Sequence, residues 1–386
     1  MLNFNYHVPT KILFGKNKIE GLGTEIKNIS DNILIVYGSS SIKKTGLYET
    51  VTSILKKSSI SFKELSEISP NPRIKIVRKG VELCKKHSLK FILAVGGGSV
   101  IDTSKAIAAG ACCNHDAWDF FLRKAQIKEA LPIGTILTLS ATGSEMNGFT
   151  VISNEETKEK LSFGSDLLRP QFSILDPTYT YTLPANQTSA GIADIFSHIL
   201  ESYFCKEKDT FLCDRIAEAL MKTCIEFGPI LLKEPDNYNA RAQIMWASSL
   251  ALNSLIASGK TGDWATHYIE HAISAVYDIT HGFGLAIITP SWMEYVLSVD
   301  TVYKFVSYAE NVWGVTGKDN MDIAKKGIEK TKEFFKALDL PLKLSDVGID
   351  DKKLDEMTDK AVMFGPLGAF KILEKEDIFK ILKSSL

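Results

Sequence analysis

The chain has 386 residues, of which 24% are charged and 45% hydrophobic, as in a globular protein with room for two or three domains. Lys and Arg number 45 against 46 Asp and Glu, so the net charge is −1 and no basic field is present to bind nucleic acid. No apolar stretch is long enough to span a membrane, no signal peptide is recognisable, and the 6 cysteines lack a CxxC pair, so we expect a cytoplasmic protein with free thiols.

Short β-branched apolar runs alternate with helical patterns in the first half of the chain, which predicts a parallel sheet covered by helices. The clearest strands are Asn32–Tyr37, Phe91–Val95 and Ile133–Leu139. Helical spacing is clearest over Lys75–His87 and Val100–Ala109. We therefore expect a Rossmann-like α/β dinucleotide-binding domain over residues 1–184.

Helical periodicity dominates the second half, where β-branched runs become rare. The longest helical stretches are 210–227, 238–258 and 318–337. A Pro and several polar residues interrupt the pattern at Thr182–Gln187, where we place the boundary. We expect an all-α domain over residues 185–386.

A glycine loop follows the apolar strand Phe91–Val95 and leads into a helix. Glycines allow a backbone to approach a pyrophosphate, and a helix N-terminus offers free N–H groups to it. Gly96, Gly97, Gly98 and Ser99 are therefore candidate cofactor residues. A tight turn that needs positive φ angles explains the glycines equally well.

Two further loops follow strands in the same half. Thr138 and Thr142 lie in TLSATGSEMN, where open α/β sheets bind ligands, although a helix N-cap beside Glu145 is an equal alternative. Gly38, Ser39 and Ser40 follow the strand Asn32–Tyr37 without the acid that selects NAD. The nearby Lys43 and Lys44 favour NADP(H) over NAD(H), unless they are ordinary solvated lysines.

Four of the 7 histidines fall at helical intervals together with one aspartate. Asp194 and His198 are spaced i, i+4 and face the same side of a helix. His267 and His271 share the same spacing, and His281 lies at a turn that ends a helix. A carboxylate with several imidazoles suits a divalent first-row cation such as Fe²⁺ or Zn²⁺. Each histidine alone is better explained as a core or surface residue, but the cluster is not.

The complete set of motifs resembles the iron-containing (group III) alcohol dehydrogenase family. GGGSVID, ATGSEMN, Asp194-x3-His198 and His267-x3-His271-x9-His281-Gly282 occur in the family's order over nearly the full chain. The similarity is greatest to the branch of NAD(P)H-dependent butanol dehydrogenases and broad aldehyde reductases.

This resemblance implies a dehydroquinate-synthase-like fold with the active site in a cleft between an α/β and an all-α domain, and a homodimer with Met1–Gly15 in its contact. It implies that the metal ligands are Asp194, His198, His267 and His281, with His271 as an additional histidine near the substrate. The implied cofactor residues are Gly38, Ser39, Ser40, Asn71, Gly96, Gly97, Gly98, Ser99, Asp102, Thr138, Thr142 and Lys160.

These residues predict a metal-dependent alcohol dehydrogenase or aldehyde reductase that uses NAD(P)(H). The nicotinamide supplies a hydride, a cation stabilises the alkoxide, and His271 is our candidate for the proton relay. Aromatic side chains flank the motifs and Lys260 is the one lysine near the His267 segment, which favours a small to medium uncharged aldehyde or primary alcohol. Glycerol dehydrogenase, another dehydroquinate-synthase-like enzyme, a metallohydrolase and a metal-free binding protein are the alternatives.

Overall fold

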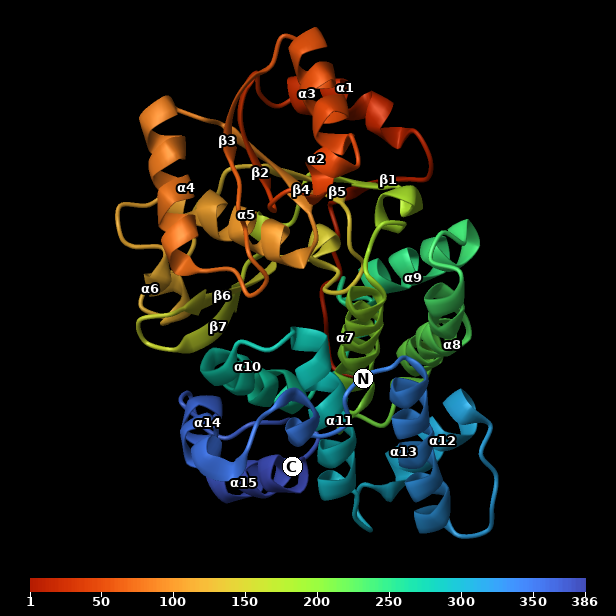
Figure 1. Cartoon of the computed structure of the whole chain (residues 1–386). Coiled ribbons are helices and arrows are strands. Elements are labelled where there is room, and N and C mark those ends of the chain that lie inside the picture. Colours follow the sequence, from red (N-terminus) through yellow and green to blue (C-terminus); the bar gives the residue numbers. More distant parts are fainter. The chain divides into compact units, whose positions relative to one another are not determined.

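The computed structural model describes residues 1–386 and divides them into two compact units (Figure 1). One unit is His7–Leu183, and the other consists of Met1–Tyr6 together with Pro184–Leu386. The first six residues therefore belong to the helical unit, which the sequence did not indicate. The Leu2 N–H donates to the Gly259 carbonyl at 2.7 Å and helps to attach them there.

The α/β unit contains a six-stranded sheet in which every neighbouring pair of strands is parallel. In spatial order the strands are β1 (Lys11–Phe14), β8 (Phe172–Leu175), β5 (Ile133–Leu137), β4 (Phe91–Gly96), β2 (Asn32–Tyr37) and β3 (Ser61–Leu65). A separate antiparallel hairpin, β6 (Phe149–Asn154) with β7 (Glu159–Gly164), was not expected from the sequence.

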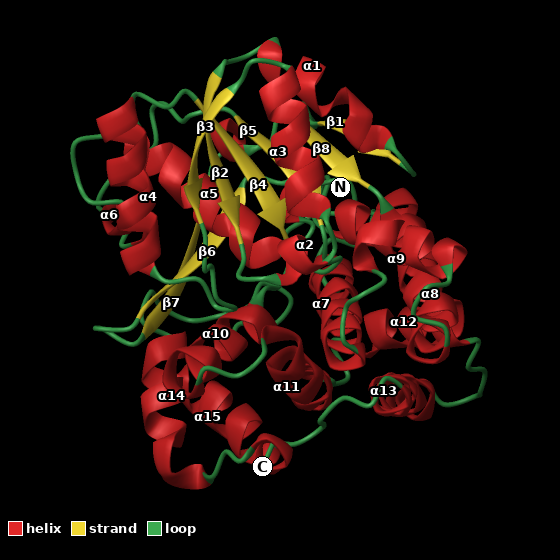
Figure 2. Cartoon of the chain, turned by 45° about the horizontal axis from the view of Figure 1, so that its top comes forward, coloured by secondary structure: helices red, strands yellow, loops and turns green.

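Each face of the sheet is covered by helices, because successive side chains of a strand point to opposite sides (Figure 2). Ile33, Ile35 and Tyr37 of β2 belong to one core cluster with the side chains of the short helices before and after the strand. Those helices are α1 (Leu22–Lys27), α2 (Ser41–Lys44) and α3 (Leu47–Lys57). Helix α5 (Gly98–Ala111) lies against β4 and packs on α4 (Ile74–His87), while α6 (Trp118–Phe121) contacts the hairpin.

The strand order reverses between β2 and β4, because the chain runs outward from β2 to β3 and then returns to the other side of β2. Tyr37 pairs with Val95, and Gly96 pairs with Leu137. The segments that begin at Gly38, Gly97 and Thr138 therefore leave the same edge of the sheet. Ligands of open α/β sheets bind at such a switch point, outside the carboxyl ends of the strands.

The second unit is built from helices, as the sequence predicts, and none of them combines the length and apolarity that crossing a bilayer requires. They are α7 (Ala185–Tyr203), α8 (Phe211–Lys233), α9 (Tyr238–Ala251), α10 (Ala265–Tyr277), α11 (His281–Val296), α12 (Val302–Trp313), α13 (Asn320–Ala337), α14 (Leu354–Ala361) and α15 (Lys375–Ser384).

Helix α9 ends seven residues before the predicted end of that stretch, at Ala251 rather than Ser258. The physical reason is local turn chemistry. The Asn253 side chain accepts a hydrogen bond from the Leu255 N–H at 3.0 Å, and Ser254 adopts a positive φ of 80°. Both features redirect the chain away from the helical path although the apolar spacing continues.

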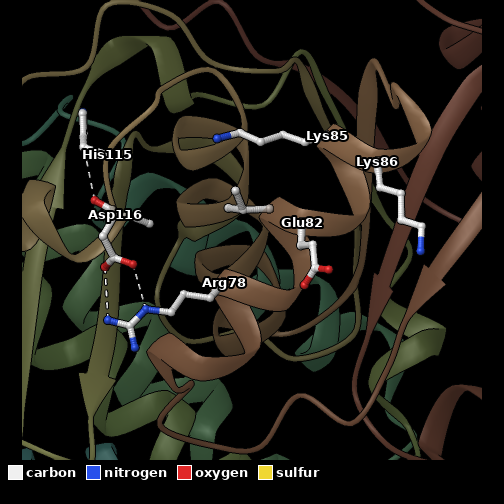
Figure 3. Close-up of a pocket in the computed structure, with 8 residues that line it drawn as sticks. Arg78, Glu82, Lys85, Lys86, His115 and Asp116 are labelled. Atoms are coloured by element: carbon white, nitrogen blue, oxygen red, sulfur yellow. Dashed lines mark hydrogen bonds and ion pairs between the residues drawn. The ribbon is translucent and has the colours of Figure 1, made fainter.

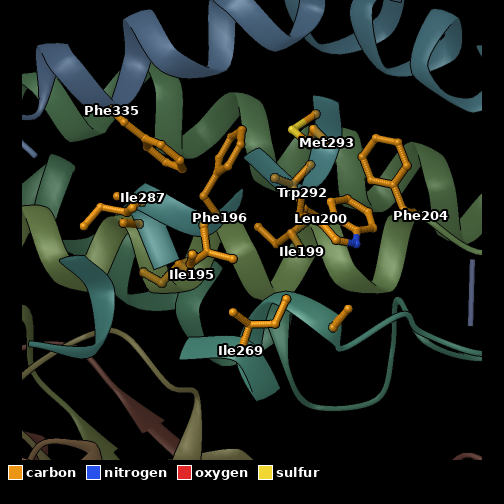
Figure 4. Close-up of a cluster of buried hydrophobic side chains, with 14 of the residues drawn as sticks. Ile195, Phe196, Ile199, Leu200, Phe204, Ile269, Ile287, Trp292, Met293 and Phe335 are labelled. Atoms are coloured by element: carbon orange, nitrogen blue, oxygen red, sulfur yellow. The ribbon is translucent and has the colours of Figure 1, made fainter. Parts of the chain in front are cut away.

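Helix α7 forms the centre of the helical unit. All its residues from Thr188 to Tyr203 are buried, which is typical of a helix surrounded by other helices. Figure 4 shows Phe196, Ile199 and Phe335 in the cluster around it, and the ring of Phe196 lies 5.9 Å from that of Phe335. Polar side chains on α7 are therefore held in a dry and closely packed environment.

Candidate metal centre and cofactor loops

Four of the predicted residues bring their donor atoms together inside the helical unit. Asp194 and His198 come from α7, His267 from α10, and His281 is the first residue of α11, not part of a turn that ends a helix. The Asp194 Oδ1 atom lies 3.2 Å from His198 Nδ1, 3.6 Å from His267 Nε2 and 3.6 Å from His281 Nε2. One carboxylate oxygen thus faces three imidazoles.

The hydrogen bonding of these residues indicates that they fit a cation. Asp194 Oδ1, His198 Nδ1 and His267 Nε2 are buried and have no hydrogen-bond partner. Buried polar atoms without partners are costly, so such a cluster points to a missing ligand. The ligand atoms of Asp194, His267 and His281 all lie within 4.8 Å of one another, which is compatible with one bound ion. His198 is outside this compact group, although its Nδ1 lies 3.2 Å from Asp194 Oδ1. Oxygen and imidazole donors suit Fe²⁺ and Zn²⁺.

Two buried glutamates, which the sequence did not reveal, contact two of the imidazoles at Nδ1, the nitrogen that faces away from Asp194. Glu201 Oε2 lies 2.6 Å from His267 Nδ1, and Glu270 Oε2 contacts His281 Nδ1. A carboxylate at Nδ1 keeps the proton on that nitrogen and leaves the Nε2 lone pair for a metal. The available signal was their spacing, since Glu201 lies three residues after His198 and Glu270 three after His267.

Charges in the cluster set the protonation states of its members. Burial disfavours the ionised carboxyl, but the His198 and His281 imidazoles outweigh it and hold the pKa of Asp194 well below its usual range. Burial lowers the pKa of His198 to about 4. Burial also opposes the charged form of His267, yet the Glu201 and Asp194 carboxylates raise its pKa to about 10. A metal therefore competes with a proton at His267.

His271 lies beside the cluster without joining the group around Asp194. It is buried, and its ring centroid lies 5.6 Å from that of His281 and 6.5 Å from that of His267. This position is compatible with the additional histidine of the resemblance. Its role in proton transfer stays a prediction.

The glycine loop is explained by close packing and not by positive φ angles, which Gly96, Gly97 and Gly98 do not adopt. A Cβ at Gly97 would lie 3.0 Å from the Leu139 side chain, and one at Gly98 would lie 2.7 Å from that of Thr142. The two predicted cofactor loops are therefore in contact. Helix α5 begins within the glycine loop, at Gly98. The first N–H groups of a helix have no partners within it, so this end of α5 is suited to a phosphate.

A buried lysine, also missed by the sequence analysis, fastens these loops together. Lys105 Nζ donates to Ser144 Oγ at 2.7 Å, to Asn147 Oδ1 at 3.0 Å and to the Phe149 carbonyl at 2.8 Å. Burial lowers its pKa to about 7 against the opposing charge of Asp102. The sequence could have indicated this role, because Asp102 and Lys105 are the only charged residues of α5 and lie three residues apart.

Asp102 is mostly turned toward this network. Its Oδ1 accepts from Ser144 Oγ at 2.6 Å and its Oδ2 from the Val151 N–H at 2.9 Å, and the residue is 8% exposed. The other predicted cofactor residues lie in the same unit. Asn71 precedes α4 in the left-handed conformation with φ 49°, and Lys160 is buried in β7. Their contacts with a cofactor stay predictions.

A surface hollow of about 480 Å³ lies elsewhere in the α/β unit and contains none of the predicted site residues. Figure 3 shows the Arg78 guanidinium directed at Asp116, with hydrogen bonds of 2.8 and 3.2 Å. Lys85 donates to the Cys113 carbonyl at 2.5 Å. These charges are engaged with the protein itself, so the hollow is no rival to the metal centre.

Comparison with known proteins identifies the family of the chain. The family models described as iron-containing alcohol dehydrogenase and as the C-terminal part of the Fe-containing alcohol dehydrogenase family match residues 9–177 and 188–386. The chain belongs to the iron-containing alcohol dehydrogenase family. The structure accordingly confirms the predicted α/β plus all-α fold, and the family implies a divalent metal and an NAD(P)(H) cofactor.

Relatives in this family include both alcohol and aldehyde enzymes. NADH-dependent butanol dehydrogenase A of Clostridium acetobutylicum is 52% identical over 388 residues, 100% of both chains. NADPH-dependent aldehyde reductase YqhD of Escherichia coli is 42% identical over 365 residues, 93% of both. The crystal structure of NADH-dependent butanol dehydrogenase A from Thermotoga maritima matches with a TM-score of 0.97 and 43% identity, covering 100% of this chain and 99% of that one. The predicted activity, an NAD(P)-linked alcohol dehydrogenase or aldehyde reductase, is thereby confirmed at the level of reaction type.

Replacing Glu201 by glutamine is expected to raise the metal dissociation constant about 10- to 100-fold. The amide would donate to His267 Nδ1, which moves the imidazole proton to Nε2 and blocks the lone pair. The measurement is competition between the protein and a chromophoric chelator for Zn²⁺. Glu218→Gln is the control, because Glu218 is a buried glutamate that accepts from Tyr203 and not from a histidine. Equal Zn²⁺ affinity in the two variants would contradict the assigned role of Glu201.

Proposed function

We propose that this chain interconverts small to medium uncharged aldehydes and primary alcohols, of the size of butanal and butanol, by hydride transfer with NADP(H). The observation that carries the proposal is the convergence of Asp194, His198, His267 and His281 in a chain that also contains a glycine loop at the switch point of a parallel sheet. Metal-ligating residues alone would fit a hydrolase, and a glycine loop alone would fit many nucleotide-binding proteins. Their combination favours a metal-dependent dehydrogenase.

The chemistry divides between the bound groups and the chain. A divalent cation supplies Lewis-acid stabilisation of negative charge on the substrate oxygen, and nicotinamide supplies the hydride. The protein contributes the donor atoms for the cation, and Glu201 and Glu270 orient His267 and His281 among them. We propose His271 as the residue that holds or passes the proton of the alcohol, and Fe²⁺ or Zn²⁺ as the ion. That the reacting groups meet between the two units stays a prediction.

The surroundings of Lys260 support an uncharged substrate. Its side chain is 0% exposed and its Nζ lies 2.9 Å from Asp214 Oδ1, while Lys304 Nζ lies 2.7 Å from Oδ2 of the same carboxylate. The lysine closest in sequence to His267 is therefore engaged inside the protein and not presented to a substrate phosphate. This disfavours a phosphorylated substrate.

Preference for NADP(H) is supported by the loop after β2. Ser39 and Ser40 are exposed where an acid would repel a 2′-phosphate. Lys43 Nζ lies 5.4 Å from the ring centroid of Tyr37 and 5.0 Å from that of Tyr48, so a cation is held beside the loop. The three relatives described above differ here, since the two butanol dehydrogenases are named as NADH-dependent and YqhD as NADPH-dependent.

Two further expectations are proposals. Exposed apolar side chains in the first six residues, Leu2, Phe4 and Tyr6 among them, support the participation of Met1–Gly15 in a homodimer contact. The cytoplasmic location rests on the sequence alone.

The central test is turnover of the purified, metal-analysed protein with NADPH and a series of aldehydes. We expect oxidation of NADPH with butanal, loss of the rate after treatment with a chelator, and recovery on addition of Fe²⁺ or Zn²⁺. Hydrolysis of esters or phosphates without nicotinamide would contradict the proposal in favour of a metallohydrolase. Higher kcat/KM for glycerol than for butanol would instead indicate the glycerol dehydrogenase alternative.

His271→Ala is expected to lower kcat by about 100-fold or more and to abolish the limb of the kcat–pH profile that reports the proton donor. Zn²⁺ affinity should stay unchanged, because His271 is outside the group around Asp194. The control is His267→Ala, which should lose the metal itself. An unaltered kcat and pH profile in His271→Ala would exclude the relay.

Ser39→Asp is expected to lower the ratio of kcat/KM with NADPH to that with NADH by about 10-fold or more, since the new carboxylate would lie where NAD-selecting sites carry one. Ser39→Asn is the matched control, which changes the side-chain size without adding charge. Equal or higher kcat/KM with NADH in the unmodified protein would disprove the cofactor preference.

A further inference from the structure

Trp264 occupies a backbone conformation that large side chains rarely adopt. It precedes the first residue of α10 with φ 65° and ψ 4°, in the left-handed region. A bulky aromatic residue is a clear outlier there, and such strain persists only where the surroundings impose it. Strained residues cluster at functional sites, so the contacts of Trp264 bear on the metal centre.

Hydrogen bonds on both sides of Trp264 fix its backbone. The Asp263 N–H donates to the Glu201 carbonyl at 2.8 Å, and the Asp263 carboxylate accepts from the Ala265 N–H at 3.2 Å. The same carboxylate accepts from the N–H groups of Ala369 and Phe370 at 2.9 and 2.8 Å. The chain before and after Trp264 is thereby attached to α7 and to the segment that precedes α15.

Gly262, two residues before Trp264, leaves space for the indole. A Cβ at Gly262 would lie 2.7 Å from Trp264 Nε1 and 3.2 Å from the Glu201 carbonyl oxygen. A side chain at position 262 would therefore collide with the indole in its present position. The left-handed backbone of Trp264 directs the indole to that position.

The indole packs edge-on against two of the proposed metal ligands at once. Its centroid lies 6.2 Å from the His198 ring with an interplanar angle of 61°, and 5.6 Å from the His267 ring with an angle of 64°. The two imidazoles are themselves 4.4 Å apart. Trp264 is half-buried and closes one side of this pair.

The three imidazoles are not supported in the same way. Glu201 orients His267 and Glu270 orients His281, each through a hydrogen bond to Nδ1. The polar contact of His198 is with Asp194, another member of the donor set, and no second carboxylate accepts from its ring. Ligand rings need an outer partner to fix their orientation, and the indole of Trp264 is a side chain outside the donor set that contacts the His198 ring.

We propose that Trp264 is the positioning residue for His198, holding its imidazole in the ligating orientation by edge-to-face packing where the other histidines use a glutamate. This inference rests on the proposed metal site. The strained turn is what places the ring between α7 and α10, since a right-handed residue would direct the side chain elsewhere.

The experiment uses Co²⁺ as the probe, bound to the full-length protein and to Trp264→Gly, Trp264→Asn and Trp264→Phe. Glycine and asparagine both accept the left-handed backbone, so the two variants remove the ring without adding strain. We expect their Co²⁺ dissociation constant to rise about 10- to 100-fold and the visible d–d absorption bands of the bound ion to shift. Trp264→Phe retains an aromatic edge and should restore most of the affinity and the spectrum.

The outcomes separate the possible explanations. Trp246→Phe is the control, because Trp246 is a partly exposed tryptophan on α9 outside the donor set, and it should leave the spectrum unchanged. Thermal unfolding of each metal-free variant shows whether it folds. Folded glycine and asparagine variants with unchanged Co²⁺ affinity and spectrum would overturn the role of Trp264. Failure of the unmodified protein to bind Co²⁺ would instead overturn the metal site and the proposed function.

Discussion

The helical unit depends on one ionised carboxylate placed in the middle of a helix that is buried on every side. Removing such a charge from water costs several kcal/mol unless opposite charges compensate it. The opposite charge comes from His267, whose pKa is raised to about 10, since His198 with its pKa of about 4 is neutral. The Asp194 carboxylate also faces His198 and His281, so that groups from α7, α10 and α11 surround it. Three helices must therefore pack closely at this point. Gly282 shows how closely, since a Cβ there would lie 2.1 Å from the Ala190 carbonyl oxygen of α7.

The α/β unit is subject to a different constraint. Its loops must leave backbone N–H groups free for a ligand and still be held rigidly by their packing. The glycine loop and the ATGSEMN loop are pressed against each other, so that side chains at Gly97 or Gly98 would collide with Leu139 or Thr142. Lys105 then ties the second loop to α5 with three hydrogen bonds. A fully buried ammonium is tolerated because each of its protons has an acceptor. The result is a rigid edge of the sheet at its switch point.

Apolar runs and residue spacing predicted several elements and placed candidate donor residues on one helix face, and they missed features that depend on tertiary contact. The strand Asn32–Tyr37 follows from a continuous apolar run, and the shared face of Asp194 and His198 follows from a spacing of four residues. Glu201, Glu270 and Lys105 look like ordinary helix residues until the packing shows what their charges face. The hairpin β6–β7 and the early end of α9 were missed because turn residues act over two or three positions.

The buried charges of the helical unit bear on the neutral substrate that we propose. Asp214 is shared by Lys260 and Lys304, and Glu218 accepts from Tyr203 and pairs with Arg215. Cations near the metal-binding segment are thus neutralised within the protein, so they add no positive field to attract an anionic substrate. Under the proposed function, a divalent cation would polarise a substrate carbonyl group, and neither Lys260 nor Lys304 would be free to add a charge contact to a phosphate.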